Sequence, residues 1–413
     1  MYENQLNTST TPIDSSPSLD TQLLDLVQAW GKELGFSQMG IASVDLSHAE
    51  QGLLEWLERG FHGEMQYMST HGLKRARPLE LVPGTLSVIT ARMNYLPRTT
   101  HTVDGAWMDE ERRRLQDMDE GVISVYARGR DYHKVMRQRL ERLAKKIQQH
   151  VSALGYRVFT DSAPVLEVEL GVQSGLGWRG KHTLLLSRDS GSMFFLGEIY
   201  VNIPLPPTPK QTPHCGSCNA CIDVCPTGAI IQPYVLDARK CISYLTIEHP
   251  GPIPIELRSK MGNHIYGCDD CQTVCPWNKF AQSSEIDDFD VRAELGFEQK
   301  NSNNSDPDSR SRAKLIDYFS WTKEEFEHKT TGTAIRRIGH ERWLRNVAVA
   351  MGNALAKEGQ INEIKIKSPS NSSVETMQFD SIKQALQDKL NHPSPLVVEH
   401  VVWALEQTAK SDA

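Results

Sequence analysis

Cysteine is the residue type whose spacing in this chain most clearly indicates chemistry. All eight cysteines fall between residues 215 and 275, in two groups that each end in a Cys-Pro pair. The groups are Cys215, Cys218, Cys221 and Cys225, then Cys241, Cys268, Cys271 and Cys275. The first has the spacing C-x₂-C-x₂-C-x₃-C-P, in which three thiols wrap one [4Fe–4S] cluster and the fourth ligates a neighbouring cluster. This segment is therefore predicted to build iron–sulfur sites.

Exchange of a cysteine between the two groups predicts which thiols hold which cluster. The second group has the spacing C-x₂₆-C-x₂-C-x₃-C, so one ligand has moved far upstream. One cluster is expected to take Cys215, Cys218, Cys221 and Cys275, and the other Cys225, Cys241, Cys268 and Cys271. Zinc, which is normally held by two short Cys-x-x-Cys units across a longer spacer, and disulfides or free thiols remain as alternatives.

Length and composition indicate a water-soluble protein of two or three domains. The chain has 413 residues, of which 39% are hydrophobic and 23% charged, and no stretch approaches eighteen uninterrupted apolar residues. The first twenty residues lack the basic and apolar regions of a secretory signal and are expected to form a disordered tail, so the protein is expected to be cytoplasmic. A net charge of −7 argues against bulk attraction to nucleic acid, but not against a local basic face, because screening acts over ~10 Å.

Helices and strands are predicted to alternate from about residue 20 to 205. A helix over 21–36 precedes strands within 38–45 and 84–97, and a long basic amphipathic helix covers 131–156. A strand, a loop and a helix follow within 157–171. This alternation predicts an α/β-layer domain, which a proline-rich hinge at 202–214 joins to the cysteine segment.

The C-terminal third reads as helices separated by polar insertions at 298–312 and 367–376. Residues 381–407 resemble one helix–turn–helix unit of the HEAT type, with Pro393 and Pro395 in the turn. Four arginines lie within ten residues of the preceding helical stretch: Arg336, Arg337, Arg342 and Arg345. Such a patch can contact nucleic-acid phosphates, although an arginine run on a helix is also commonly a solvated or ion-paired face.

Three stretches rich in polar residues and glycine stand out before the cysteines: "YARGRDYHK" (126–134), "TDSAPVLE" (160–167) and "SGLGWRGKHT" (174–183). No G-x-G-x-x-G follows a strand, so a dinucleotide site has no support. Asp131 is placed to cap a helix, and Asp161 to form an Asx turn. Alternatively, Asp161 at a strand end inside a closed pocket would have its acidic form favoured by desolvation, as a proton donor needs.

Taken in order with "RKCISYLTIE", "GNHIYGCDDCQTVCPWN" and "IRRIGHERWLRNVAVAMGNAL", these stretches closely resemble the epoxyqueuosine reductase family over roughly residues 20–297 and 314–405. The resemblance implies an α+β multidomain protein with a disordered tail (1–20), a cobalamin-binding catalytic domain of the α/β-layer type (21–205), a two-[4Fe–4S] ferredoxin-like domain (206–285) and a helical, HEAT-like tRNA-binding domain (286–413). The implied reaction reduces the epoxide of epoxyqueuosine to queuosine at wobble position 34 of tRNA, with electrons passing through the clusters to cobalamin.

The resemblance also implies roles for individual residues. Asp161 matches the proton donor, and Asp131 with His133 is expected to orient cofactor or substrate. Cobalamin contacts are expected from Arg75, Ser124, Asp161, Lys181, Leu185, Leu196 and Ser243, although Leu185 and Leu196 read equally well as core residues. Contacts with tRNA are expected from Arg336, Arg337, Arg342 and Arg345. The D-x-H-x-x-G stretch of proteins that place a histidine on cobalt is absent, so no protein histidine is expected there.

The expected partners are tRNA bearing epoxyqueuosine and an external low-potential electron donor of the flavodoxin or ferredoxin type, with the protein a monomer away from membranes. One rival reading is a related corrinoid reductase, such as a reductive dehalogenase. Another is a ferredoxin-like electron carrier with an RNA-binding appendage and no catalysis of its own. Retention of cobalamin by the purified protein separates the carrier from the enzyme.

Overall fold

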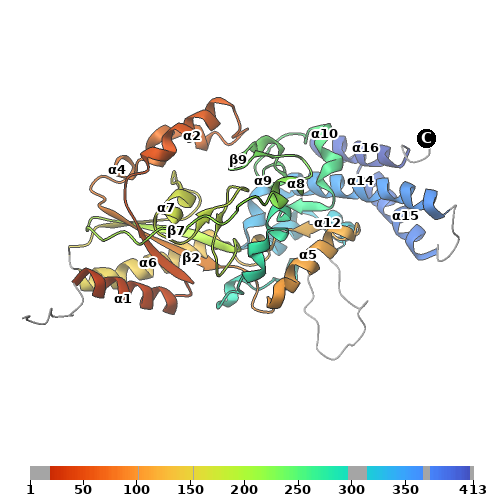
Figure 1. Cartoon of the computed structure of the whole chain (residues 1–413). Coiled ribbons are helices and arrows are strands. Elements are labelled where there is room, and N and C mark those ends of the chain that lie inside the picture. Colours follow the sequence, from red (N-terminus) through yellow and green to blue (C-terminus); the bar gives the residue numbers. More distant parts are fainter. Residues whose placement is uncertain (1–18, 101, 152, 296–313, 366–372, 410–413) are drawn as a thin grey trace, which may run out of the picture.

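A computed structural model of the chain describes residues 19–100, 102–151, 153–295, 314–365 and 373–409 (Figure 1). The expected tail up to residue 18 and the expected insertion at 298–312 lie outside these residues. Of the expected insertion at 367–376, the part from Ser373 onward begins helix α15 (Ser373–Gln387).

A four-stranded sheet forms the centre of the N-terminal part. Its strands are β1 (Gln38–Ala42), β2 (Ser87–Asn94), β4 (Tyr156–Phe159) and β7 (Phe194–Val201). They lie in the order β1-β2-β7-β4, and each neighbouring pair is antiparallel. The predicted alternation of helices and strands is present, and the antiparallel pairing places this layer in the α+β class.

Helices cover both faces of this sheet (Figure 1). On one face lie α1 (Leu19–Glu33) and α6 (Tyr132–His150), and on the other α7 (Glu167–Gln173), with α2 (Ser47–Glu58) and α4 (Pro78–Leu81) beyond it. The short helix α3 (Tyr67–Thr70) lies between α2 and α4 in the sequence. Because side chains alternate along a strand, Ile89 of β2 packs into the core under α1 and α6. Its neighbour Thr90 instead donates to Ser174 Oγ, just after α7. The second face therefore carries the polar groups.

The cysteine region is built from short elements that a second, two-stranded sheet ties to the N-terminal part. Strand β10 (His264–Tyr266) pairs in parallel with β3 (Val122–Ile123). The other elements around the cysteines are α5 (Ala106–Gln116), the pair β5 (Trp178–Arg179) and β6 (Leu185–Leu186), α8 (Ala220–Asp223), the hairpin β8 (Ile230–Gln232) and β9 (Val235–Leu236), α9 (Ile242–Ile247), α10 (Ile255–Arg258) and α11 (Asp270–Thr273).

Helices make up the C-terminal part: α12 (Leu315–Ser320), α13 (Lys323–Lys329), α14 (Gly339–Lys365), α15 and α16 (Pro395–Ala409). A single apolar core runs from Leu245 of α9 through Trp343 and Val347 of α14 to Val401 of α16. The cysteine region and the C-terminal helices therefore fold against each other as one packed unit. None of the helices described has the length and apolar character needed to cross a membrane.

Arg345 of α14 fixes the end of α9 and the segment that follows it. Its side chain is fully buried, and its guanidinium donates to the carbonyl oxygens of Leu245, His249 and Gly251, each at 2.7 Å. A further bond runs to Asn346 Oδ1. Buried carbonyls of an irregular segment need donors, and this side chain supplies three of them from a helix on the other side of the core.

Arg345→Met is therefore expected to lower the free energy of unfolding by about 3 kcal/mol, because it leaves buried carbonyls without donors. Arg336→Met is the matched control, since the Arg336 side chain is 48% exposed and its loss should change stability by less than about 0.5 kcal/mol. Calorimetry of the two anaerobically purified variants measures the difference. Equal unfolding midpoints would contradict the role given to Arg345.

Candidate active site

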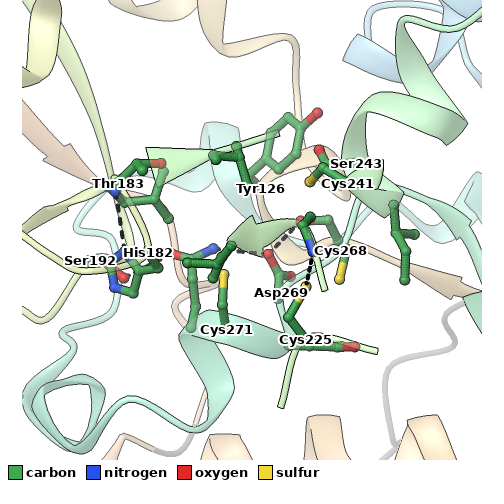
Figure 2. Close-up of a pocket in the computed structure, with 18 of the residues that line it drawn as sticks. Tyr126, His182, Thr183, Ser192, Cys225, Cys241, Ser243, Cys268, Asp269 and Cys271 are labelled. Carbon is green, nitrogen blue, oxygen red and sulfur yellow. Dashed lines mark hydrogen bonds between the residues drawn. The ribbon is translucent and has the colours of Figure 1, made fainter. Parts of the chain in front are cut away.

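The eight cysteines lie in two sets of four, and each set borders its own cavity. Cys215, Cys218, Cys221 and Cys275 border a small cavity of about 50 Å³. Cys225, Cys241, Cys268 and Cys271 border a larger cavity of about 370 Å³ (Figure 2). All eight are free thiols. The structure thus brings together the two sets that the exchange of a cysteine between the groups predicts.

Local backbone geometry holds these thiols in place. The Cys218 N–H donates to the Cys215 carbonyl at 3.1 Å, which closes a tight turn between two ligands of one set. Gly267, directly before Cys268, has a φ of +71°, and a Cβ there would lie 2.6 Å from Ser124 Cβ. Glycine alone satisfies both conditions, so this residue lets the loop of the second set approach the N-terminal part.

The environment of these thiols suits metal ligands and not a catalytic nucleophile. Burial raises the pKa values of Cys241, Cys268 and Cys271, and it raises the pKa of Cys275 to about 11. A nucleophilic cysteine needs the opposite shift. Iron ions at the site would supply the positive charge that makes the thiolates favourable.

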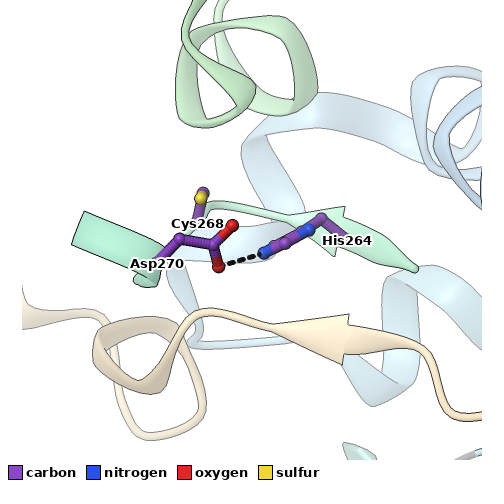
Figure 3. Close-up of side chains that lie close together, drawn as sticks. All are labelled: His264, Cys268 and Asp270. Carbon is purple, nitrogen blue, oxygen red and sulfur yellow. Dashed lines mark hydrogen bonds and ion pairs between the residues drawn. The ribbon is translucent and has the colours of Figure 1, made fainter. Parts of the chain in front are cut away.

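A buried ion pair supports Cys268 from behind (Figure 3). His264 Nε2 donates to Asp270 Oδ1 at 2.9 Å, and His264 Nδ1 donates to the Met261 carbonyl at 2.7 Å. The three ligand-type atoms of His264, Cys268 and Asp270 lie within 4.8 Å of one another. Because both ring nitrogens are already engaged, we interpret this group as support for a cysteine of the second set, and not as a separate metal site.

The lining of the larger cavity matches the chemistry of cobalamin, in addition to holding the second set of cysteines. Aromatic rings form one side, with Tyr132 and Phe195 stacked at 4.2 Å. Hydroxyl groups line it too, among them those of Ser124, Thr183, Ser192 and Ser243. A corrin ring has broad apolar faces and a rim of amide groups, so flat apolar walls with scattered hydrogen-bonding groups match its chemistry.

Only two of the residues expected to contact cobalamin border this cavity, Ser124 and Ser243. Arg75 is buried elsewhere, and it donates to the carbonyls of Tyr67, Met68 and Ala163. Lys181 borders the small cavity, where its ammonium donates to the Cys218 carbonyl at 2.8 Å and to Asn219 Oδ1 at 3.0 Å.

The two expected leucines have structural roles. Leu185 is buried in an apolar core with Leu176 and Phe194, and Leu196 packs against that core. The Leu196 carbonyl accepts a hydrogen bond from Thr160 Oγ1, next to Asp161. The reading of both leucines as core residues therefore describes their positions in this structure.

The catalytic residues expected from the sequence meet in one hydrogen-bonded group. His133 Nδ1 lies 2.8 Å from Asp131 Oδ1, and His133 Nε2 lies 2.8 Å from Asp161 Oδ2. Tyr132, which lines the larger cavity, donates its hydroxyl to Asp161 Oδ2. Asp131 also caps α6 by accepting the His133 backbone N–H, so the capping prediction is confirmed, and the same carboxylate contacts the His133 ring.

Charges in this group differ from the sequence expectation for Asp161. Partial desolvation raises the pKa of Asp161, whose side chain is 53% exposed, but hydrogen bonds from His133 and Tyr132 outweigh it, so the pKa lies below its usual value. Burial opposes the charge of His133, yet hydrogen bonds to Asp131 and Asp161 raise its pKa to about 9. The shift of Asp161 is therefore opposite to the one that desolvation alone predicted from the sequence, and the raised pKa of His133 favours the proton on the imidazole.

Two glutamates, Glu167 and Glu198, lie next to Asp161. The Asp161 N–H donates to Glu167 Oε1 at 2.6 Å, and this bond holds Asp161 in a left-handed conformation with a φ of +49°. Glu167 is in turn hydrogen-bonded to Glu198, which is buried on β7. Burial, together with the charge of Asp161, raises the pKa of Glu167 to about 8, and burial raises that of Glu198 well above its usual value. Two carboxyl groups can share a hydrogen bond only when one carries a proton.

The four arginines expected to bind tRNA do not form one exposed patch. Arg345 is fully buried, so its side chain cannot reach a phosphate, and this expectation was wrong. Arg342 donates to the carbonyls of Ile338, Ile247 and Arg337. Arg336 and Arg337 are half exposed, and Arg337 pairs with Glu248. At helical spacing Arg342 and Arg345 share a face of α14, and this face packs against the cysteine region.

Sequence reasoning missed three members of this site: Tyr132, Glu167 and Glu198. A signal existed for Glu198, since it is the lone charged residue in the apolar strand "FFLGEIYV". Tyr132 lies between two residues that were singled out, Asp131 and His133. Nothing in the sequence distinguishes Glu167 from Glu169, which pairs at the surface with Arg179.

Comparisons with known proteins identify the family. Residues 75–162 match the family model described as "Epoxyqueuosine reductase QueG, DUF1730", and residues 214–278 match the "4Fe-4S double cluster binding domain". The epoxyqueuosine reductase of Alicycliphilus denitrificans is 57% identical over 94% of this chain and 98% of that protein. The epoxyqueuosine reductase of Escherichia coli is 47% identical over 95% of this chain and 91% of that protein.

A solved structure shares the fold. The crystal structure of an epoxyqueuosine reductase with a tRNA-Tyr epoxyqueuosine-modified stem loop matches with a TM-score of 0.72 and 23% identity, over 94% of this chain and 100% of that one. With two curated relatives at 47% and 57% identity over nearly their full lengths, the conclusion is direct: this chain belongs to the epoxyqueuosine reductase family.

Proposed function

We propose that this protein reduces the epoxide of epoxyqueuosine to the alkene of queuosine at wobble position 34 of tRNA, using electrons that two [4Fe–4S] clusters deliver to cobalamin. One observation carries the proposal. Asp131, His133 and Asp161 form one hydrogen-bonded group, and Tyr132 donates to Asp161 of this group. Tyr132 also lines the cavity that the second set of cysteines borders. A source of protons and a source of electrons therefore adjoin one cavity.

The overall reaction takes two electrons and two protons, breaks both C–O bonds of the epoxide and releases water. Cobalamin, when bound, would supply a strongly reducing cobalt centre for this chemistry. Ser124 and Ser243 would hold it from the cavity wall, and the aromatic side formed by Tyr132 and Phe195 would keep water from its face.

The chain's own contribution is to hold and deliver a proton. Before substrate binds, the proton lies on His133 Nε2, 2.8 Å from Asp161 Oδ2. The Asp161 side chain is 53% exposed, so a bound nucleoside would remove water from it and raise its pKa. The proton can then move from His133 to Asp161 and on to the epoxide oxygen as that oxygen leaves, while Asp131 stabilises the histidine.

We assign the first cluster to Cys215, Cys218, Cys221 and Cys275, and the second to Cys225, Cys241, Cys268 and Cys271. Cys218 is the exposed member of the first set, so an external donor of the flavodoxin or ferredoxin type would transfer electrons there. The domain limits proposed are 21–205, 206–285 and 286–413. We further propose that the protein acts as a cytoplasmic monomer.

Contact with tRNA is assigned to Arg336 and Arg337, the two half-exposed arginines at the start of the helical region. Arg337 also forms a side-chain hydrogen bond with Tyr266, next to the aromatic residue Tyr126 that lines the larger cavity. A phosphate bound here would lie near the cavity mouth and position the anticodon without reading bases.

Asp161→Asn is expected to lower kcat for epoxide reduction by about 10²- to 10⁴-fold, because the amide still accepts from Tyr132 but cannot pass on a proton. Iron content and the absorption spectrum of bound cobalamin should match the wild type. Single-turnover assays on a stem loop carrying epoxyqueuosine measure the loss. Near-normal turnover would remove Asp161 from the mechanism.

The rate is expected to fall as pH rises through about 9, because the proton on His133 is lost there. Asp131→Asn removes one of the two carboxylates that raise the pKa of His133, so the alkaline limb of kcat should move to lower pH. Glu167 titrates near 8 beside the same group, and the profile of Glu167→Gln separates its contribution. The control Asp109→Asn alters an exposed carboxylate of α5. An unshifted limb in Asp131→Asn would refute the assignment.

Arg336→Gln is expected to weaken stem-loop binding several-fold and to reduce the slope of log Kd against log salt by about 1, with kcat unchanged. The control is Arg112→Gln, an exposed arginine of α5 paired with Asp109. Fluorescence titrations at several salt concentrations measure both effects. An unchanged salt slope would place the tRNA elsewhere.

A further inference from the structure

His182 is the one described residue that borders both cysteine-lined cavities. It lies between β5 and β6, directly after Lys181, and it is 3% exposed. The first set of cysteines surrounds the small cavity on one side of it, and the second set surrounds the larger cavity on the other, where Figure 2 labels His182 with Cys225 and Cys271. Its ring therefore lies at the junction of the two cluster sites.

The hydrogen bonding of this ring fixes where its proton lies. The Leu184 N–H donates to His182 Nδ1 at 3.1 Å, so Nδ1 is an acceptor and carries no hydrogen. Burial lowers the pKa of the ring to about 4, in keeping with a neutral imidazole. The single ring hydrogen must then be on Nε2.

Packing also restricts the ring. A Cβ at Gly180 would lie 2.7 Å from His182 Cε1 and 3.1 Å from His182 Nδ1, so the ring lies directly against the glycine backbone. With Gly180 on one side and the Leu184 N–H holding Nδ1, the imidazole has a set orientation. Nε2 is buried and has no hydrogen-bond partner among the described residues. Buried donors are nearly always paired in proteins, so a group absent from the polypeptide is the natural acceptor.

We propose that His182 Nε2–H donates a hydrogen bond to a sulfur of one of the two [4Fe–4S] clusters and thereby raises the reduction potential of that cluster. Hydrogen bonds to cluster sulfurs are among the factors that set such potentials, because they stabilise the more negative, reduced form. Because His182 can donate to only one cluster, the bond makes that cluster easier to reduce relative to the other, and the electron is found more often on it. The inference rests on the presence of the clusters and not on the identity of the substrate.

The test is an EPR-monitored redox titration of anaerobically reconstituted protein without tRNA. His182→Phe keeps a planar ring but removes the donor, whereas His182→Gln can place an amide N–H where Nε2 lies. His214→Phe is the matched control, because His214 borders the small cavity but is exposed. Iron and sulfide analysis first establishes that each variant holds both clusters.

In His182→Phe the reduced-to-oxidised ratio of one cluster at fixed potential should fall by about tenfold, which is ~59 mV for a one-electron couple. The cluster that shifts is the one whose sulfur accepts the bond. His182→Gln should recover most of the shift, and His214→Phe should show none. Unchanged potentials in His182→Phe, or equal shifts in the Phe and Gln variants, would overturn the proposal.

A measurement on the unmutated protein covers the case in which His182→Phe fails to assemble its clusters. Protein labelled with ¹⁵N-histidine should give, in pulsed EPR of a reduced cluster, a ¹⁵N coupling that is lost in His182→Gln, whereas any coupling from His214 or His264 should persist in both proteins. Identical histidine couplings in the wild type and in His182→Gln would equally overturn the proposal.

Discussion

The exchange of one cysteine between two ligand sets is the constraint on which the rest of this structure depends. Cys225 follows the first three ligands closely but belongs with Cys241, Cys268 and Cys271, while Cys275 returns across some sixty residues to complete the first set. Neither cavity can form alone. Bringing α8 to α11 also brings β10 against β3, which places the cavity beside the N-terminal sheet.

Near that sheet, the titratable groups Asp161, His133 and Glu167 have pKa values that their surroundings shift in different directions. Tyr132 and His133 donate to Asp161 and lower its pKa, and the two carboxylates beside His133 raise the pKa of the imidazole. Burial and neighbouring charge raise the pKa values of Glu167 and Glu198, which favours their neutral forms. Titratable groups whose environments separate their pKa values are how one site holds an acid and a base together. Glu167 fixes the backbone of Asp161 by accepting its N–H, and His133 contacts the Asp161 carboxylate through Nε2.

Contacts between residues close in the sequence could be predicted from the sequence, and most contacts between distant residues could not. The cysteine sets were predictable because iron imposes a short, regular spacing, and the cap at Asp131 because a capping bond spans two residues. The residue pattern predicted α1, α6, β1 and β2 close to their positions, but it did not predict β7. It also could not say that the Arg345 face packs inward, since that depends on carbonyls about a hundred residues away. Glu167 and Glu198 meet only because β7 is central in the sheet and α7 lies over it. Family resemblance supplied Asp161, yet its charge depends on Tyr132 and His133, whose geometry no motif encodes.

The segment from Cys241 to Gly251, which includes α9, joins the second set of cysteines to the surface assigned to tRNA. Cys241 borders the larger cavity, Glu248 pairs with Arg337, and Arg345 donates to the carbonyls of the segment at Leu245, His249 and Gly251. A single short stretch of backbone, held by one buried arginine, therefore connects a cysteine of the second set to the surface assigned to tRNA, so Arg345 keeps the cluster site and that surface in a fixed relation.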